Sequence, residues 1–146
     1  ELAGCYRRYN VPLCRTIHLG PAPQAIIDAS KALTEGLEKG LEQAVAGNRA
    51  CDIANALTET LAKAGIDRHG RCGYPIGISY PPDWGERTIS LRSNDDSILE
   101  PGMTFHFMPG LWMDDWGIET TETILITDTG APYMFTNLPR ELTIKP

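Results

Sequence analysis

The stretch LEPGMTFHFMPG, residues 99–110, carries the clearest structural signal in the chain. A turn sequence is followed by an alternating run in which Phe105 and Phe107 flank His106. Alternation with a period of two is typical of a strand that buries one face. We therefore expect a strand over residues 103–110, with both phenylalanines in the core and His106 on the opposite face.

Further strands and two helices are predicted on either side of this segment. Apolar residues recur at three- and four-residue steps from Ile26 to Val45 and again from Ile53 to Ala64, which predicts two amphipathic helices. Gly36 and Gly40 interrupt the first helical pattern or permit close packing. The other predicted strands are 1–9 and 11–19, joined at Asn10, then 76–80, 87–92, 117–127 and 133–136. Segregated strands and helices predict an α+β fold with a mostly antiparallel sheet and helices on one face.

Composition restricts the partners of the chain. The formal charge of −6 and the absence of a Lys/Arg cluster argue against nucleic acid. No apolar run is long enough for a transmembrane helix and no secretory leader opens the chain, so we expect no membrane partner and a cytoplasmic location. The four cysteines show no zinc-site spacing and are expected to be free buried thiols.

Three ordered blocks carry a resemblance to a known family. They are RTIHLG at residues 15–20, CGYPIG at 72–77, and LEPGMTF at 99–105 followed by TETILITDTG at 121–130. In order and spacing they resemble the pita-bread family of methionine aminopeptidase, aminopeptidase P, prolidase and creatinase. The resemblance implies a curved, partial pita-bread fold. It also implies that residues 1–146 are the C-terminal part of a longer catalytic domain.

The resemblance also implies a lost metal site. Peptidase members of the family bridge two metal ions with two Asp, one His and two Glu, which suit hard divalent cations. Those positions fall on the following residues of this chain: Glu1, Pro12, Tyr74, Met108 and Thr121. Only Glu1 keeps a carboxylate. We therefore expect no metal and no other cofactor.

Within the family, the chain resembles the ectoine hydrolase branch. The segments that carry this likeness are ELAGCYRRY at residues 1–9, GYPIGISYPPDWGER at 73–87 and HFMPGLWMDDWG at 106–117. The branch implies hydrolysis of a small cyclic amidine, in which ectoine is opened to an acetylated diaminobutyrate without a metal. Two alternatives stay open, a dinuclear metallopeptidase and a non-catalytic fragment that binds a zwitterion or a peptide.

Three residues are candidates for catalysis. Glu1 could attack an amidine carbon or pair with its cation, and it is the preferred catalytic residue. His106 is a candidate acid or base, with a hydrogen-bonded core histidine as the alternative. Strand alternation places Glu119 on the cavity side and Glu122 on the other face.

Four residues are candidates for binding the small-molecule substrate. Tyr74 could donate a hydrogen bond from its hydroxyl. Trp112, Asp114 and Trp116 share a loop that suits a cationic ring, or that anchors a crossover. Arg15 is a further candidate for a substrate carboxylate. The family resemblance implies a homodimer.

Overall fold

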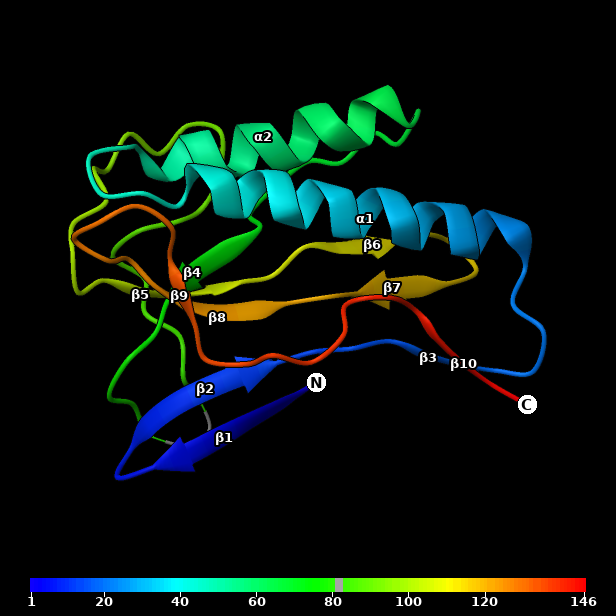
Figure 1. The fold of residues 1–146 in the computed structure, drawn as a ribbon, viewed down its shortest axis with the longest axis horizontal. Coiled ribbons are helices and arrows are strands. Elements are labelled where there is room, and N and C mark those ends of the chain that lie inside the picture. Colours follow the sequence, from blue (N-terminus) through cyan, green and yellow to red (C-terminus); the bar gives the residue numbers. More distant parts are fainter. Residues whose placement is uncertain (81–82) are drawn as a thin grey trace.

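The computed structural model describes residues 1–80 and 83–146. Two helices form one layer, a sheet lies beneath them, and an N-terminal hairpin extends below the sheet (Figure 1). The elements are β1 (Leu2–Tyr6), β2 (Tyr9–Leu13), β3 (Ile17–Leu19), α1 (Gln24–Gln43), α2 (Ala50–Lys63), β4 (Gly73–Pro75), β5 (Thr104–Phe107), β6 (Gly110–Trp112), β7 (Gly117–Glu119), β8 (Glu122–Leu125), β9 (Tyr133–Met134) and β10 (Thr143–Lys145).

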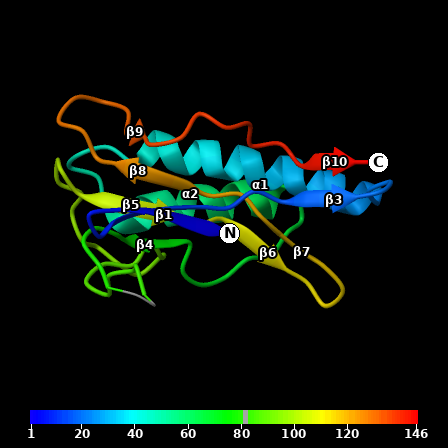
Figure 2. The same cartoon turned by 90° about the horizontal axis from the view of Figure 1, so that it is seen from below.

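The central sheet has the strand order β4-β5-β8-β9, and all of its pairs are antiparallel. β6 and β7 continue β5 and β8 as a second antiparallel pair, after a break at Met108-Pro109 on one side and at 120–121 on the other. Both helices cover the same face (Figure 2). The predicted α+β class with a mostly antiparallel sheet and helices on one face is therefore confirmed.

The core lies between the helices and the sheet. Phe105 and Phe107 are fully buried, as the alternation predicted. A Cβ added to Gly36 would lie 2.7 Å from Cδ1 of Leu57, and one added to Gly40 would lie 2.7 Å from Cε1 of Phe107. The two glycines therefore permit close packing of α1 against α2 and against β5, and they do not interrupt the helix.

Several boundaries differ from the sequence predictions. The first hairpin turns at Arg7-Arg8, not at Asn10, and both arginines have positive φ. Such a pair is the geometry of a two-residue type I′ turn, which Asn and Gly usually supply. Residues 76–80 and 87–92 form no strands; the second segment is tied to the sheet through backbone hydrogen bonds of Leu91 to Cys72 and Gly73.

The C-terminal end supplies a strand that the sequence did not suggest. β10 pairs in parallel with β3, from Thr143 opposite Ile17 to Lys145 opposite Leu19. All four cysteines are free, but Cys5 is exposed, so the prediction of buried thiols holds for the other three. Neither helix in the described part of the chain is long and apolar enough to cross a membrane.

Candidate active site

A buried pair of ring residues, Tyr74 on β4 and His106 on β5, forms the centre of the site. The two residues are directly opposite in the antiparallel register, which brings their side chains to the same face. The Tyr74 hydroxyl lies 2.8 Å from Nδ1 of His106, and the rings meet edge to face. His106 has no exposed surface, and burial lowers its pKa to about 4. The imidazole is therefore neutral at pH 7.

Trp84 donates a hydrogen bond to the same hydroxyl. Its indole Nε1 donates to the Tyr74 hydroxyl at 3.0 Å, and an indole N–H has no acceptor function. The phenol oxygen accepts from Trp84, and we assign its own proton to the bond with Nδ1 of neutral His106. This assignment, made from the network, places the His106 proton on Nε2, which is buried and has no hydrogen-bond partner among the described residues.

Two carboxylates lie near this pair. Oε1 of Glu1 is 3.8 Å from Nδ1 of His106, and the Glu1 side chain is 34% exposed, so it reaches both the histidine and solvent. Burial raises the pKa of Glu119, and the charge of Glu1 raises it further, against a hydrogen bond from Cys14 that lowers it. The charges of Glu1 and Glu119 also act on Tyr74, whose pKa is raised mainly by burial. The structure therefore brings together Glu1, Glu119, Tyr74 and His106.

The neighbouring thiol is unsuited to act as a nucleophile. Cys14 is buried, and burial together with the Glu119 carboxylate raises its pKa to about 11. A thiol with such a pKa is almost entirely protonated at neutral pH.

The tryptophan loop is not in contact with this cluster. Trp112, Asp114 and Trp116 belong to the β6–β7 hairpin, whose tip points away from β4 and β5 (Figure 2). Trp112 is 63% exposed, and its ring covers Gly110, while Trp116 packs against the hydrophobic core. No contact recorded for the described residues joins this loop to Tyr74 or His106, so its substrate-binding role stays a prediction.

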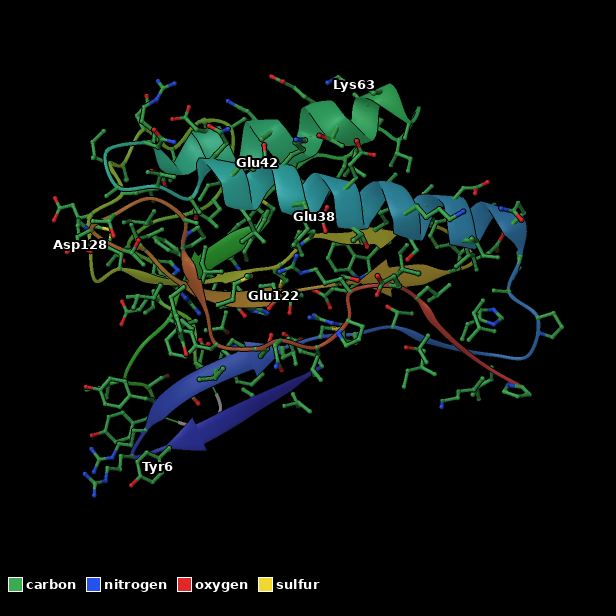
Figure 3. The ribbon with its side chains drawn as sticks, viewed as in Figure 1. Tyr6, Glu38, Glu42, Lys63, Glu122 and Asp128 are labelled. Atoms are coloured by element: carbon green, nitrogen blue, oxygen red, sulfur yellow. The ribbon has the colours of Figure 1, made fainter. Side chains whose placement is uncertain are left out.

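Arg15 is a structural residue. Its guanidinium donates to Glu122 at 2.7 Å and to the carbonyl oxygens of four residues, namely Cys14, Thr121, Leu138 and Pro139. Glu122 is 1% exposed and also accepts from Arg140 and Thr136. With its donors occupied, Arg15 has none for a substrate carboxylate, and the expectation of such a role is wrong. Glu122, labelled on β8 in Figure 3, is directly opposite Phe107 and not His106, so it shares the face of the buried Phe107 and lies away from the site, as the alternation predicted.

The curved antiparallel sheet, its two covering helices and the polar cluster at β4 and β5 define a pita-bread fold. Residues 1–128 match the model of metallopeptidase family M24. The chain belongs to this family.

Solved structures agree with the fold. Dipeptidase PepE from Mycobacterium ulcerans superposes with a TM-score of 0.88 at 22% identity, covering 97% of this chain and 38% of that one. A dipeptidase from Pyrococcus horikoshii OT3 gives the same TM-score at 25% identity, with 98% and 39% covered.

Among curated relatives, ectoine hydrolase of Halomonas elongata is 60% identical over 146 residues, which is 99% of this chain and 36% of the relative. An uncharacterised hydrolase/peptidase of Sinorhizobium fredii is 41% identical over 145 residues, with 99% of this chain and 37% of the relative covered. The chain thus spans little more than a third of the length of these relatives.

The family's metal positions do not supply a dinuclear donor set in this chain. Pro12 has no donor, Met108 offers a thioether, and Oγ1 of Thr121 accepts the backbone N–H of Cys14 at 2.7 Å. The Tyr74 hydroxyl is engaged by Trp84 and His106. Over residues 1–80 and 83–146, no three His, Cys, Asp or Glu side chains gather in a metal-binding group. We therefore assign no step to a metal.

Trp84 was missed as a site residue by the sequence analysis. It lies in an irregular segment between β4 and β5, where no strand or helix pattern indicates the direction of a side chain. The only available signal was its position within the 73–87 block of the branch resemblance.

Proposed function

We propose that this chain is the C-terminal part of the catalytic domain of a hydrolase that opens the ring of ectoine, a small cyclic amidine, to an acetylated diaminobutyrate. The observation that carries the proposal is the 60% identity to ectoine hydrolase over 99% of the chain. The complete protein then acts without a metal, because four of the five ligand positions hold Pro12, Tyr74, Met108 and Thr121.

Glu1 is the reactive carboxylate in this proposal. A cyclic amidinium is cationic and electrophilic at the carbon between its nitrogens, so a carboxylate attracts it and attacks it, or activates a water that attacks. By either route water is consumed. Its oxygen ends on the acetyl carbon, the bond from that carbon to one ring nitrogen breaks, and the freed amine takes the protons.

The Tyr74–His106 pair serves the departing nitrogen. His106, the candidate acid or base of the sequence, has no exposed surface, and its Nδ1 faces Tyr74, so it does not reach a substrate directly. We therefore assign the proton for the departing nitrogen to the Tyr74 hydroxyl, which donates it to Nδ1 of neutral His106 until the substrate nitrogen replaces the imidazole as its acceptor. Glu119 stays the second candidate carboxylate, since its raised pKa makes it a better proton carrier than an ordinary glutamate.

Replacing Glu1 by Gln tests the proposal, because Gln keeps the size of the side chain and removes its charge and nucleophilicity. In the complete protein, turnover of ectoine is expected to fall by ~10³-fold or more with the thermal midpoint preserved. Glu42→Gln, on the exposed face of α1, is the matched control and should keep full turnover. Near-normal turnover by a folded Glu1→Gln protein would exclude Glu1 and move the assignment to Glu119.

A dinuclear metallopeptidase is the second candidate, favoured by the family itself. It requires stoichiometric metal after dialysis and loss of peptide hydrolysis on chelation. The donor set described above opposes it. Binding of ectoine without any hydrolysis would instead support the non-catalytic alternative.

A further inference from the structure

Next to the Tyr74–His106 pair lies a polar pocket of about 240 Å³ that the proposed mechanism does not use. Its walls are formed by Arg71, Tyr74, Asp83, Trp84, Gly85, Glu86 and Arg87. Tyr74 is shared by the two sites, since its ring faces the pocket and its hydroxyl meets His106. A ligand in this pocket therefore lies against the residue that we assign to proton transfer.

Arg71 is the distinctive group of the pocket. Its guanidinium carbon lies 4.9 Å from the centroid of the Tyr74 ring, a stacked position that leaves the edge N–H groups free. Among residues 1–80 and 83–146 this guanidinium makes no ion pair and no side-chain hydrogen bond. By contrast, Arg87 has a partner, Asp83, at 3.7 Å.

The pocket carries both signs of charge. Asp83 is held by Arg87 and by the backbone N–H of Gly85 at 3.0 Å, and the hydrogen bond from Gly85 is the main cause of its lowered pKa. Glu86 adds a second carboxylate to the wall. A doubly charged anion such as phosphate would meet these carboxylates, whereas a zwitterion with one carboxylate places it at Arg71 and its cationic part toward the acids.

We propose that Arg71 binds the carboxylate of a small zwitterionic substrate, oriented by its stacking on Tyr74. This inference rests on the proposed function, in which the ligand is ectoine, whose ring bears one carboxylate beside the amidine. A planar guanidinium recognises a carboxylate through two parallel hydrogen bonds, which fix orientation as well as affinity. Arg71 thus selects ring amidines that carry the acid and holds them against the Tyr74 ring.

The test compares two substrates in the complete protein: ectoine, and 2-methyl-1,4,5,6-tetrahydropyrimidine, the same ring without the carboxylate. Arg71→Gln should raise KM for ectoine about 10–100-fold, the effect of losing a charge-assisted contact. It should change turnover of the carboxylate-free ring less than about 2-fold. Arg71→Lys keeps the charge but cannot form the two parallel hydrogen bonds, so its KM for ectoine should lie between those of the wild type and Arg71→Gln. The control is Arg92→Gln, an exposed arginine outside the pocket.

Equal losses of activity on ectoine and on the carboxylate-free ring would overturn the proposal, because Arg71 would then only position Tyr74 and would not bind the substrate carboxylate. No loss on ectoine would also overturn it. If the wild-type protein hydrolyses neither ring, the proposed function fails, and ectoine binding is then measured by titration calorimetry. In that case, weaker ectoine binding by Arg71→Gln than by the wild type still supports a carboxylate site at Arg71. Equal binding by the two proteins, or no binding by either, overturns the proposal.

Discussion

Nδ1 of His106 and the hydroxyl of Tyr74 lie 2.8 Å apart at a position where neighbouring antiparallel strands place their residues directly opposite. The contact joins an imidazole with no exposed surface to a phenol that is itself 8% exposed. This pair gives the site a defined proton arrangement before any substrate binds, and it also makes stability depend on pH.

His106 should make the protein less stable in mild acid. The unfolded chain protonates this histidine near pH 6.5, whereas the folded state does so only near pH 4, so protons favour unfolding within that window. The stability that His106 confers is complete above pH 6.5 and falls by up to about 3 kcal/mol as the pH drops to 4. Urea unfolding of wild type and His106→Asn across this range measures the difference. His18→Asn should keep the wild-type slope, and the same slope in both variants would contradict the assignment.

Glu119 should have the opposite dependence. Burial raises its pKa in the folded state, so its contribution to stability is present below the ordinary pKa of glutamate and is lost as the pH rises through the raised value. Glu119→Gln should therefore gain stability relative to wild type on going from pH 4 to pH 7. The exposed Glu59→Gln on α2 provides the comparison and should stay within about 0.5 kcal/mol of wild type. If the difference in free energy of unfolding between Glu119→Gln and wild type did not change with pH, the raised pKa of Glu119 in the folded state would be contradicted.

The buried carboxylate of Glu122 should be essential for folding. It is 1% exposed and bound by Arg15 at 2.7 Å, Arg140 at 2.9 Å and Thr136 at 2.6 Å. Glu122→Gln removes the counter-charge of Arg15 and leaves Arg140 only the exposed Glu38 at 3.7 Å, and we expect a loss of about 3–5 kcal/mol in the free energy of unfolding. Glu42→Gln breaks an exposed pair with Lys39 of similar length and should cost at most about 1 kcal/mol. Chemical denaturation of both variants measures the two losses in free energy of unfolding. Losses of similar size would contradict the stabilising role assigned to the buried Glu122 carboxylate.

Gly40 should not tolerate a methyl group. An added Cβ would meet the Phe107 ring, which is fully buried and has little room to move, so Gly40→Ala should destabilise by about 1–3 kcal/mol despite the better helix propensity of alanine. Gly77→Ala is the control, because nothing lies within 4 Å of its added Cβ. Thermal unfolding of the two variants checks this, and a stabilised Gly40→Ala protein would contradict the packing.

Much of this arrangement follows from periodicity. The alternation around His106 placed Phe105 and Phe107 in the core, and the same reasoning placed Glu122 on the face opposite the site. Periodicity fails where the chain is irregular. The turn at Arg7-Arg8 uses residues that rarely adopt positive φ, so no local signal marked it.

The contact of Trp84 with Tyr74 depends on a loop whose path no local pattern encodes. Arg15 was misjudged for a related reason. A strand pattern gives the face of a side chain but not its partners, and Glu122 reaches it from a segment 107 residues away in sequence.

The contact between Gly40 and Phe107 has a mechanical consequence. Phe107 adjoins His106 in the chain and faces Gly73, the neighbour of Tyr74, across the strand pair. A push from α1 on the Phe107 ring would therefore bear on the backbone that sets the spacing of the Tyr74–His106 pair. If the Tyr74–His106 pair transfers a proton as proposed, a substitution at Gly40 would change the rate of that transfer from a position on α1 that does not contact the pair.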